Sequence, residues 1–291
     1  MHKSVPHKIF TYVNNTFLAV LAAVCVLPLI HVFALSLSSS AAATGNLVTF
    51  WPVQLTFEAY TETLGNGNFM HALLNGVKRT ALGTVVSMLL MLLAAYPLSK
   101  EEHKFRGRSV YAWFFVFTML FHAGLIPTYL VVKGTGLMNT VWALVIPGAV
   151  SVWNLILLLN FFRTIPKELE EAALMDGAGH LRILFQIYLP VSMPSIATLS
   201  LFTMVTHWNA WFDGMLYMSN SQDYPLSTFL RSIIVSENFA ALGLTEDEIK
   251  NISPRTVKAS QIFIGALPIL AVYPFLQKYF VKGVILGSVK E

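Results

Sequence analysis

The chain has 291 residues, of which 55% are hydrophobic and 12% are charged, and its formal net charge is +4. Its single cysteine, Cys25, excludes a disulfide framework and a zinc site built on cysteines. The charges lie in short blocks between long uncharged segments, which excludes an ordinary soluble domain and is typical of a polytopic membrane protein.

Six uncharged segments are long enough to cross a membrane as helices. None of the six contains Asp, Glu, Lys or Arg, and each can span roughly 30 Å of hydrocarbon. A helix satisfies its own backbone hydrogen bonds in hydrocarbon, so we predict an all-α fold with six transmembrane helices. In chain order the segments are residues 16–37, 80–98, 109–132, 140–162, 189–212 and 259–277.

The first segment has an alternative interpretation as the core of a signal peptide, because Lys3 and Lys8 precede it and small residues come after it at 38–45. Its length of about twenty residues exceeds the ~7–15 residues of a usual signal core, so we expect a retained helix. After it we expect an outer connection with a short amphipathic helix from about Phe57 to Leu64.

The placement of Lys and Arg predicts the orientation of the chain. With the N-terminus inside, twelve of the 19 Lys and Arg residues fall in inner segments and the other seven in outer segments. Four of those seven lie in the long outer segment after the fifth helix, where Lys and Arg have the least influence on the orientation of the chain. We therefore predict that both termini are cytoplasmic. This inward bias accounts for most of the net positive charge, so no nucleic-acid partner is needed to explain it.

The inner loop at residues 163–190 has the pattern of a short, free-standing helix. Thr164 is the expected N-cap, Pro166 lies near the first helical position, and glutamates fill the early turns, where the helix dipole favours anions. Asp176 and Gly177 end this helix, and a second helix is expected at about 179–188 before Pro190.

One face of the first loop helix is small and nearly flat. Leu169, Ala172, Ala173 and Asp176 share this face at spacings of three and four residues. An isolated helix of about ten residues is marginal in water. We therefore expect another molecule to pack against this face.

The same loop carries a signature of seven fixed positions at fixed spacing. The positions are Glu171, Ala172, Ala173, Gly177, Ile187, Leu189 and Pro190. They match the EAA signature of the membrane subunits of bacterial ABC importers, and the chain resembles that family. The resemblance implies that the loop is a coupling helix, which sits in a groove on a cytoplasmic ATPase subunit.

The resemblance extends over essentially the whole chain and is best from about 71 to 282. The stretch "FHAGLIPTYLVVKGTG" and the ending "YPFLQKYFVKGVILGSVKE" resemble carbohydrate-importer permeases, in particular their LplC/YtcP-type branch. This implies the fold of a binding-protein-dependent ABC importer permease, with an N-terminal helix and outer segment (1–70), a five-helix core (71–282) and a cytoplasmic tail (283–291). It also implies a bacterial cytoplasmic membrane protein that works with a second permease, two ATPase subunits and an extracytoplasmic solute-binding protein.

The chain carries no energy source of its own in its sequence. It has no GxxxxGK[ST] phosphate loop. Ion-coupled carriers usually need ionisable side chains within their membrane segments, and the six predicted segments contain no charged residue. We expect no cofactor on this chain, with ATP and Mg²⁺ bound by the partner ATPases. Their closure would move the coupling helix and drive alternating access.

The first set of candidate site residues lies in the coupling helix. Glu171 and the early-turn glutamates are expected to meet basic groups of the ATPase, although Glu171 could instead only cap its own helix. The small residues allow close approach, and Gly177 turns the chain. The candidate coupling residues are Glu168, Glu171, Ala172, Ala173, Asp176 and Gly177.

The candidate substrate path is nominated from polar and aromatic residues in or near the segments. Trp211 could instead belong to an aromatic belt at the membrane boundary, and two of the polar residues, His122 and Asn154, could serve helix-to-helix hydrogen bonding. The nominated residues are His122, Asn154, Thr203, His207, Asn209 and Trp211.

We therefore predict a permease subunit that imports a sugar or oligosaccharide. A permease for a peptide, an amino acid or an anion is the alternative within the same superfamily, and an ion-coupled carrier is a further one. An enzyme is disfavoured because the sequence has no HExxH or GxSxG motif and its eight histidines show no i, i+4 pairs.

Overall fold

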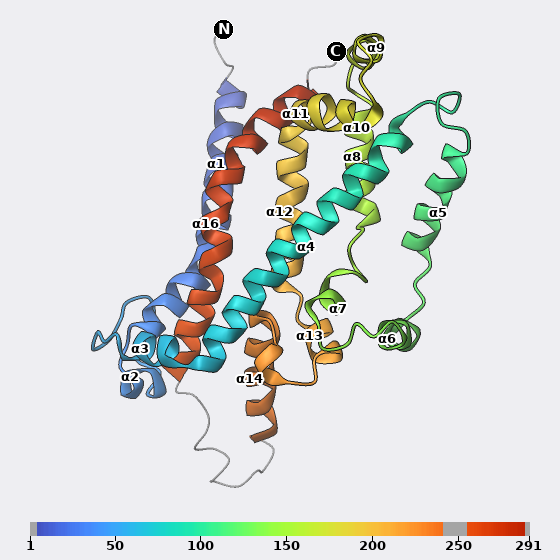
Figure 1. The fold of residues 1–291 in the computed structure, drawn as a ribbon. Coiled ribbons are helices and arrows are strands. Elements are labelled where there is room, and N and C mark those ends of the chain that lie inside the picture. The colour runs from blue at the N-terminus through green and yellow to red at the C-terminus, as the bar shows by residue number, and fades with distance from the viewer. Residues whose placement is uncertain (1–4, 241–254, 289–291) are drawn as a thin grey trace. The chain divides into compact units, whose positions relative to one another are not determined.

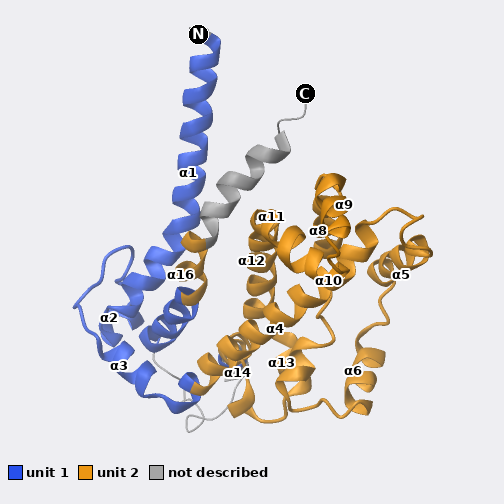
Figure 2. Cartoon of the chain, turned by 45° about the horizontal axis from the view of Figure 1, so that its top comes forward, with its two compact units in different colours: residues 1–70, 232–267 blue, residues 71–231, 268–291 orange. Residues whose placement is uncertain are grey.

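The computed structural model describes residues 5–240 and 255–288, which form helices and short connections, with no β-strand among them. This agrees with the all-α prediction. The chain divides into two compact units, one made of residues 1–70 and 232–267 and the other of residues 71–231 and 268–291 (Figure 2). The boundaries predicted at residues 70 and 282 stay predictions; the last helix runs through residues 283–288 of the predicted tail, and 289–291 lie outside the described residues.

The first unit is built on one long helix. Its core is formed by small and aliphatic side chains, and the start of α16 joins it through a 2.5 Å hydrogen bond between the hydroxyls of Thr63 and Ser260. The helix expected at Phe57 to Leu64 is confirmed as α3, one residue later at each end. The helices that contribute to this unit are α1 (Val5–Ser36), α2 (Ser40–Thr44), α3 (Glu58–Gly65) and part of α16 (Arg255–Ser288).

The second unit contains the chain between α4 and the start of α14. Figure 1 shows α4 as a long diagonal rod, beside which α8 and α12 run in a different direction. Its elements are α4 (Gly67–Ser99), α5 (Arg108–Leu120), α6 (Leu125–Gly134), α7 (Val141–Val145), α8 (Val152–Phe162), α9 (Lys167–Met175), α10 (His180–Ile183), the π-helical turn η1 (Leu184–Tyr188), α11 (Leu189–Val191), α12 (Met193–Asn209), α13 (Phe212–Tyr217), the 3₁₀ turn η2 (Ser221–Asp223) and the start of α14 (Leu226–Ala240).

The main core of the second unit lies where α4 and α8 meet the chain from α10 to α12. Met91, Leu158 and Ile183 are fully buried in it, one from each of these parts. A second, smaller core lies between α6, α7 and α13 and contains Val132, Leu144 and Tyr217. The end of α4 is therefore held by packing next to the loop that carries α9.

Three helices of the described chain are long and apolar enough to cross a membrane unbroken: Pro6–Ser36, Gly67–Ser99 and Arg255–Phe275. The count rises to five if two bent pairs each form one span. The first pair, α5 and α6, is bent by 116°, and the chain on either side of Ser192 is bent by 86°. The prediction of six spans is therefore supported in part.

The third and fourth predicted segments are not single helices. The third breaks between α5 and α6, where Gly124 has φ +88°. The fourth breaks between α7 and α8 at Pro147 and Gly148, because proline has no N–H to continue the helical ladder. Hydrophobicity alone predicted the two segments, and it does not register these local backbone breaks.

Candidate functional site in the loop between α8 and α12

The helix α9 begins without a side-chain cap. Pro166 occupies the cap position and supplies no capping hydrogen bond, and the Thr164 hydroxyl instead donates to the carbonyl of Phe161 at 2.8 Å. The prediction of Thr164 as N-cap is therefore wrong. Glu168 and Glu170 lie in the first turn, where carboxylates interact favourably with the helix dipole.

The end of α9 is closed by a Schellman motif. Asp176 is the C-cap, and the N–H groups of Gly177 and Ala178 donate to the carbonyls of Leu174 and Ala173 at 3.0 and 2.9 Å. Gly177 has φ +76°, a left-handed conformation that glycine adopts at little cost. Beyond Gly177 and its two chain neighbours, no atom lies within 4 Å of the position of the missing Cβ, so backbone conformation rather than crowding favours glycine here.

The signature positions divide into an inward set and an outward set. Ala173, Ile187 and Leu189 pack against the main core of the second unit. Glu171 and Ala172 are exposed on α9. The inward set fixes the loop to its own chain, which leaves the outward set available to another molecule.

The outward face of α9 also carries apolar side chains. Met175 is 88% exposed and Leu169 is 44% exposed, while Glu168 and Asp176 are exposed beside them. Of the face predicted to be small and flat, Ala173 alone is partly covered by its own chain. The exposed surface of α9 is therefore partly apolar and accessible to another molecule.

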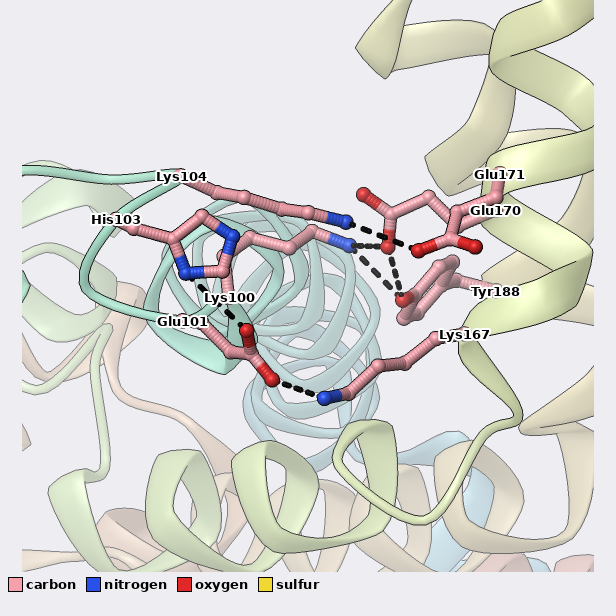
Figure 3. A network of polar contacts seen from close by, with 8 residues as sticks. All are labelled: Lys100, Glu101, His103, Lys104, Lys167, Glu170, Glu171 and Tyr188. Atoms are coloured by element: carbon pink, nitrogen blue, oxygen red, sulfur yellow. Dashed lines mark hydrogen bonds and ion pairs between the residues drawn. The ribbon is translucent and has the colours of Figure 1, made fainter.

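The second helix predicted for the loop is present but irregular. It begins as α10, widens into the π-helical turn η1 and continues as α11, so the predicted range 179–188 is helical almost throughout. A π turn inserts one residue into the helix and rotates the next turn about the helix axis. Tyr188 lies at the end of this turn, buried and directed toward α9 (Figure 3).

A buried polar network joins the end of α4 to α9 (Figure 3). The Lys100 ammonium donates to Glu170 Oε2 at 2.6 Å and to the Tyr188 hydroxyl at 2.9 Å, and that hydroxyl donates to the same Oε2 at 2.8 Å. The ammonium also lies 3.9 and 4.1 Å from the ring centroids of Tyr96 and Tyr188, within cation–π range. Each polar group of this network thus has a partner.

Burial and charge act in opposite directions on this network. Burial alone would raise the pKa of the Glu170 carboxyl, but hydrogen bonds from Lys100 and Tyr188 and the lysine charge outweigh it and hold that pKa below its ordinary value. Burial lowers the pKa of Lys100, and the carboxylate partly offsets this. We take the pair to be ionised near neutral pH, because the geometry is that of a charge-assisted hydrogen bond.

Exposed ion pairs surround the buried one. Lys167 on α9 pairs with Glu101, whose other oxygen lies 3.2 Å from His103 Nδ1. Lys104 lies 3.7 Å from Glu171. Such solvent-exposed pairs contribute little stability, so Lys104 leaves Glu171 available to a partner.

Sequence reasoning missed the inward direction of Glu170 and the role of Lys100. Glu170 precedes Ala173 by three residues, so both lie on the same helical face, and that face packs inward. Lys100 comes directly after a long uncharged segment, which in sequence looks like an ordinary boundary charge. The spacing to Ala173 could not identify Glu170 by itself, because the sequence analysis took Ala173 to face a partner, and only the structure shows it packed against the core.

The candidate path residues do not form one site. His122 is exposed at the break between α5 and α6, whereas Asn154 is buried in the first turn of α8. Asn209 is exposed at the last position of α12. Trp211 is half-buried, with Arg231 stacked 4.9 Å from its ring centroid.

Two nominated residues of α12 lie buried against other groups. Thr203 donates to the carbonyl of Leu199 within its own helix at 2.8 Å. His207 Nε2 lies 3.4 Å from the Ser87 hydroxyl of α4. A Cβ on Gly83 would lie 2.6 Å from His207 Nε2, so this glycine allows the close approach of the two helices.

Arg79 of α4 is a further polar residue; it is one of the seven Lys and Arg residues that the charge count assigned to outer segments. It is only 2% exposed; it donates to the carbonyl of Ala210 at 2.8 Å and pairs with Asp213. It thereby holds the break between α12 and α13. An adjacent pocket of about 200 Å³ is almost wholly apolar and is lined in part by Thr80, Met204 and Trp208, so it does not suit a sugar.

Comparisons with known proteins place this loop in a family context. Residues 88–286, more than half of the chain, match the model of the binding-protein-dependent transport system inner membrane component family. The chain is 40% identical over 98% of its length to the polygalacturonan/rhamnogalacturonan transport system permease protein YtcP of Bacillus subtilis (strain 168), covering 99% of that protein. It is 38% identical over its full length to the protein LplC of the same organism, covering 98% of it.

A solved structure agrees with these sequence relatives. A chain from the crystal structure of a bacterial ABC transporter involved in the import of the acidic polysaccharide alginate superposes with a TM-score of 0.84 and 34% identity, over 96% of this chain and 99% of that one. The resemblance to the ABC importer permeases is thus confirmed, as is the prediction of a transport subunit rather than an enzyme. The chain belongs to the family of binding-protein-dependent transport system inner membrane components.

Proposed function

We propose that this chain is the permease subunit of an ATP-driven importer that moves a sugar or oligosaccharide across the bacterial cytoplasmic membrane. The names of relatives with 34 to 40% identity support a glycan substrate, since one carries polygalacturonan and rhamnogalacturonan and another belongs to an alginate importer. All three named substrates are acidic polysaccharides, so oligomers of uronic acids are the first to test. The chain would have six transmembrane helices and two cytoplasmic termini.

The observation that carries the mechanism is the division of α9 into an anchored face and a free face. Ala173 and Glu170 hold the helix to its own chain, while Glu171, Ala172 and Met175 are exposed. A surface with small and apolar side chains between carboxylates suits a groove with a basic rim. We propose that this groove belongs to an ATPase subunit, which binds ATP and Mg²⁺.

The family supplies the remaining proposed partners. A second permease of different sequence would complete the pathway, and a solute-binding protein would deliver the sugar from outside. ATP-driven closure of two ATPases would move α9, and the transmembrane helices would then rock between inward-open and outward-open arrangements. Among the nominated path residues, His207 has the strongest support, because it lies in a buried polar cluster with Ser87 close to Arg79 and Asp213.

A substitution at Ala172 tests the docking surface. The complete complex would be purified with Ala172→Arg or Ala172→Ser in this chain. We expect the arginine to block close approach, so that co-purified ATPase and ATP-driven uptake are lost while the permease remains folded, because Ala172 faces outward. Serine, which is nearly as small as alanine, should retain both.

The substrate for the uptake assay would be chosen with the solute-binding protein. Thermal-shift measurements of that protein with oligogalacturonides, alginate oligomers and maltooligosaccharides identify the sugar. Full ATPase binding by the arginine variant would contradict the proposed docking surface. Stabilisation by peptides or amino acids, but by no sugar, would contradict the proposed substrate class.

A further inference from the structure

The helix α9 is tied to the end of α4 by the buried ion pair between Lys100 and Glu170. Lys100 comes directly after Ser99, the last residue of α4, and the two side chains are only 9% and 5% exposed. Within α9, all of which is described, Glu170 is the one buried side chain. This pair is therefore the main polar link between the proposed docking helix and the long helix α4.

The other connections of α9 are less able to transmit a displacement. On one side the chain passes through Pro166, and on the other it passes through Gly177 and Gly179 before α10 begins. Glycine adopts several backbone conformations readily, so a displacement of α9 can be taken up there. Ala173 offers only a small apolar contact, whereas a charge-assisted hydrogen bond is strong and directional.

In its N-terminal half, α4 meets the polar cluster around Arg79. About 20 residues separate Arg79 from the end of the helix, which corresponds to about 30 Å along its axis. The same helix carries Gly83 and Ser87, which pack against His207, and Arg79 holds Asp213 after the end of α12. A shift of α4 therefore reaches the residues nominated for the substrate path.

We propose that Lys100 is a positioning residue that passes the displacement of α9 to α4, so that movement of the docking helix reaches the cluster around Arg79 instead of being absorbed in the flanking loops. This inference rests on the proposed function, because it takes α9 to be the docking helix. The Tyr188 hydroxyl supports this link, because it donates to the same Glu170 oxygen that accepts the hydrogen bond from Lys100.

The test removes the ion pair without leaving one buried charge. The double variant Lys100→Met with Glu170→Gln does this, whereas either change alone leaves an unpaired buried charge and destabilises the folded chain. Lys100→Arg keeps the charge and the hydrogen bonding. The matched control is Lys167→Met with Glu101→Gln, an exposed pair that joins the same two segments.

Each variant is reconstituted in proteoliposomes as the full complex with both ATPases, the second permease and the binding protein. Three quantities are measured: co-purified ATPase, ATP hydrolysis, and oligogalacturonide taken up per ATP hydrolysed. We expect the double variant to keep ATPase binding and hydrolysis and to lose about tenfold in uptake per ATP. Lys100→Arg and the control pair should keep the wild-type ratio.

Several outcomes would overturn the inference. An unchanged ratio in the double variant would show that the pair transmits nothing. Loss of ATPase binding would show that the pair serves only to shape the docking surface. An equal loss of uptake per ATP in the control variant would show that the buried pair has no special role. If the wild-type complex itself shows no ATP-driven uptake, the proposed function fails, and this inference fails with it.

Discussion

At the scale of single residues, the environment of Glu170 shows how a carboxylate can be kept ionised in a buried position. Lys100, Tyr188 and, farther away, Lys104 face it, and the first two donate directly to its oxygen. A glutamate that stands within a run of glutamates could not be assigned such a role from composition. Its direction is set by the helical period and by where the core lies.

The pH dependence of stability provides a test at this residue. Folding lowers the pKa of Glu170 below its ordinary value of 4.5. A carboxyl with a depressed pKa stabilises the folded state fully above its unfolded pKa and loses this contribution as the pH falls through the folded pKa. We expect the purified permease to have a higher Tm than its Glu170→Gln variant at pH 7, and the difference to shrink below about pH 4.5.

Other titrating groups should not disturb this comparison. Lysine and tyrosine side chains ordinarily titrate above pH 7, outside the range of this comparison. His180 contacts Tyr96 rather than Glu170 and is present in both proteins. Glu101→Gln is the control: its carboxyl is exposed, so the change in Tm should be small at every pH. A difference for Glu170→Gln that stays constant down to pH 3 would contradict the ionised pair.

At the scale of elements, the loop helices show which parts of the signature are structural. Ala173, Ile187 and Leu189 pack inward, and Gly177 closes the Schellman motif. The sequence predicted the presence of α9, its end at Asp176 and the turn at Gly177. It did not predict the π turn of η1, because a π turn depends on how the flanking residues pack rather than on local propensity.

Substitutions at Gly177 separate conformation from bulk. Because space is open around this residue, the penalty for a side chain comes from φ +76°, which costs a β-branched residue about 1–2 kcal/mol or more. We expect Gly177→Val to loosen the end of α9 and to lower ATP-driven uptake by the complex. Asn adopts the left-handed conformation more readily, so Gly177→Asn should retain most of the uptake.

Hydrogen exchange of residues 167–178 reports the same effect without transport. Faster exchange is expected in the valine variant, with little change in the asparagine variant. If valine and asparagine lower uptake equally, the side chain itself interferes with a partner, and the conformational explanation is wrong.

At the scale of the whole molecule, the fold class and the family were predictable because they depend on repeated or fixed patterns. Uncharged segments of membrane-spanning length predicted the helices, and the spacing from Glu171 to Pro190 predicted the transport family. The breaks at Gly124 and Ser192 were not predictable from hydrophobicity, because a bent helix pair and a straight helix have the same composition. The candidate path residues were chosen by their side-chain chemistry, which does not determine position. The structure places them on different helices and connections, so they do not form one site.

The orientation of the chain is the remaining prediction at this scale, and Met175 allows it to be tested. This side chain is 88% exposed at the end of α9, so Met175→Cys should not disturb the fold. In a Cys25→Ser background the new cysteine would be the chain's one thiol. We expect a membrane-impermeant maleimide to leave it unlabelled in intact cells and to label it rapidly in inside-out vesicles, because the proposed orientation places α9 on the cytoplasmic side.

The same cysteine reports docking when the ATPase is present. Seating α9 in a groove would cover Met175, so labelling in inside-out vesicles should slow when the ATPase subunits are co-expressed and should recover with Ala172→Arg. A cysteine at the exposed position Trp51, in the segment between α2 and α3, serves as the opposite control, since the proposed orientation places it outside, where the reagent reaches it in intact cells. Labelling of position 175 in intact cells would reverse the orientation and remove the basis for coupling through α9.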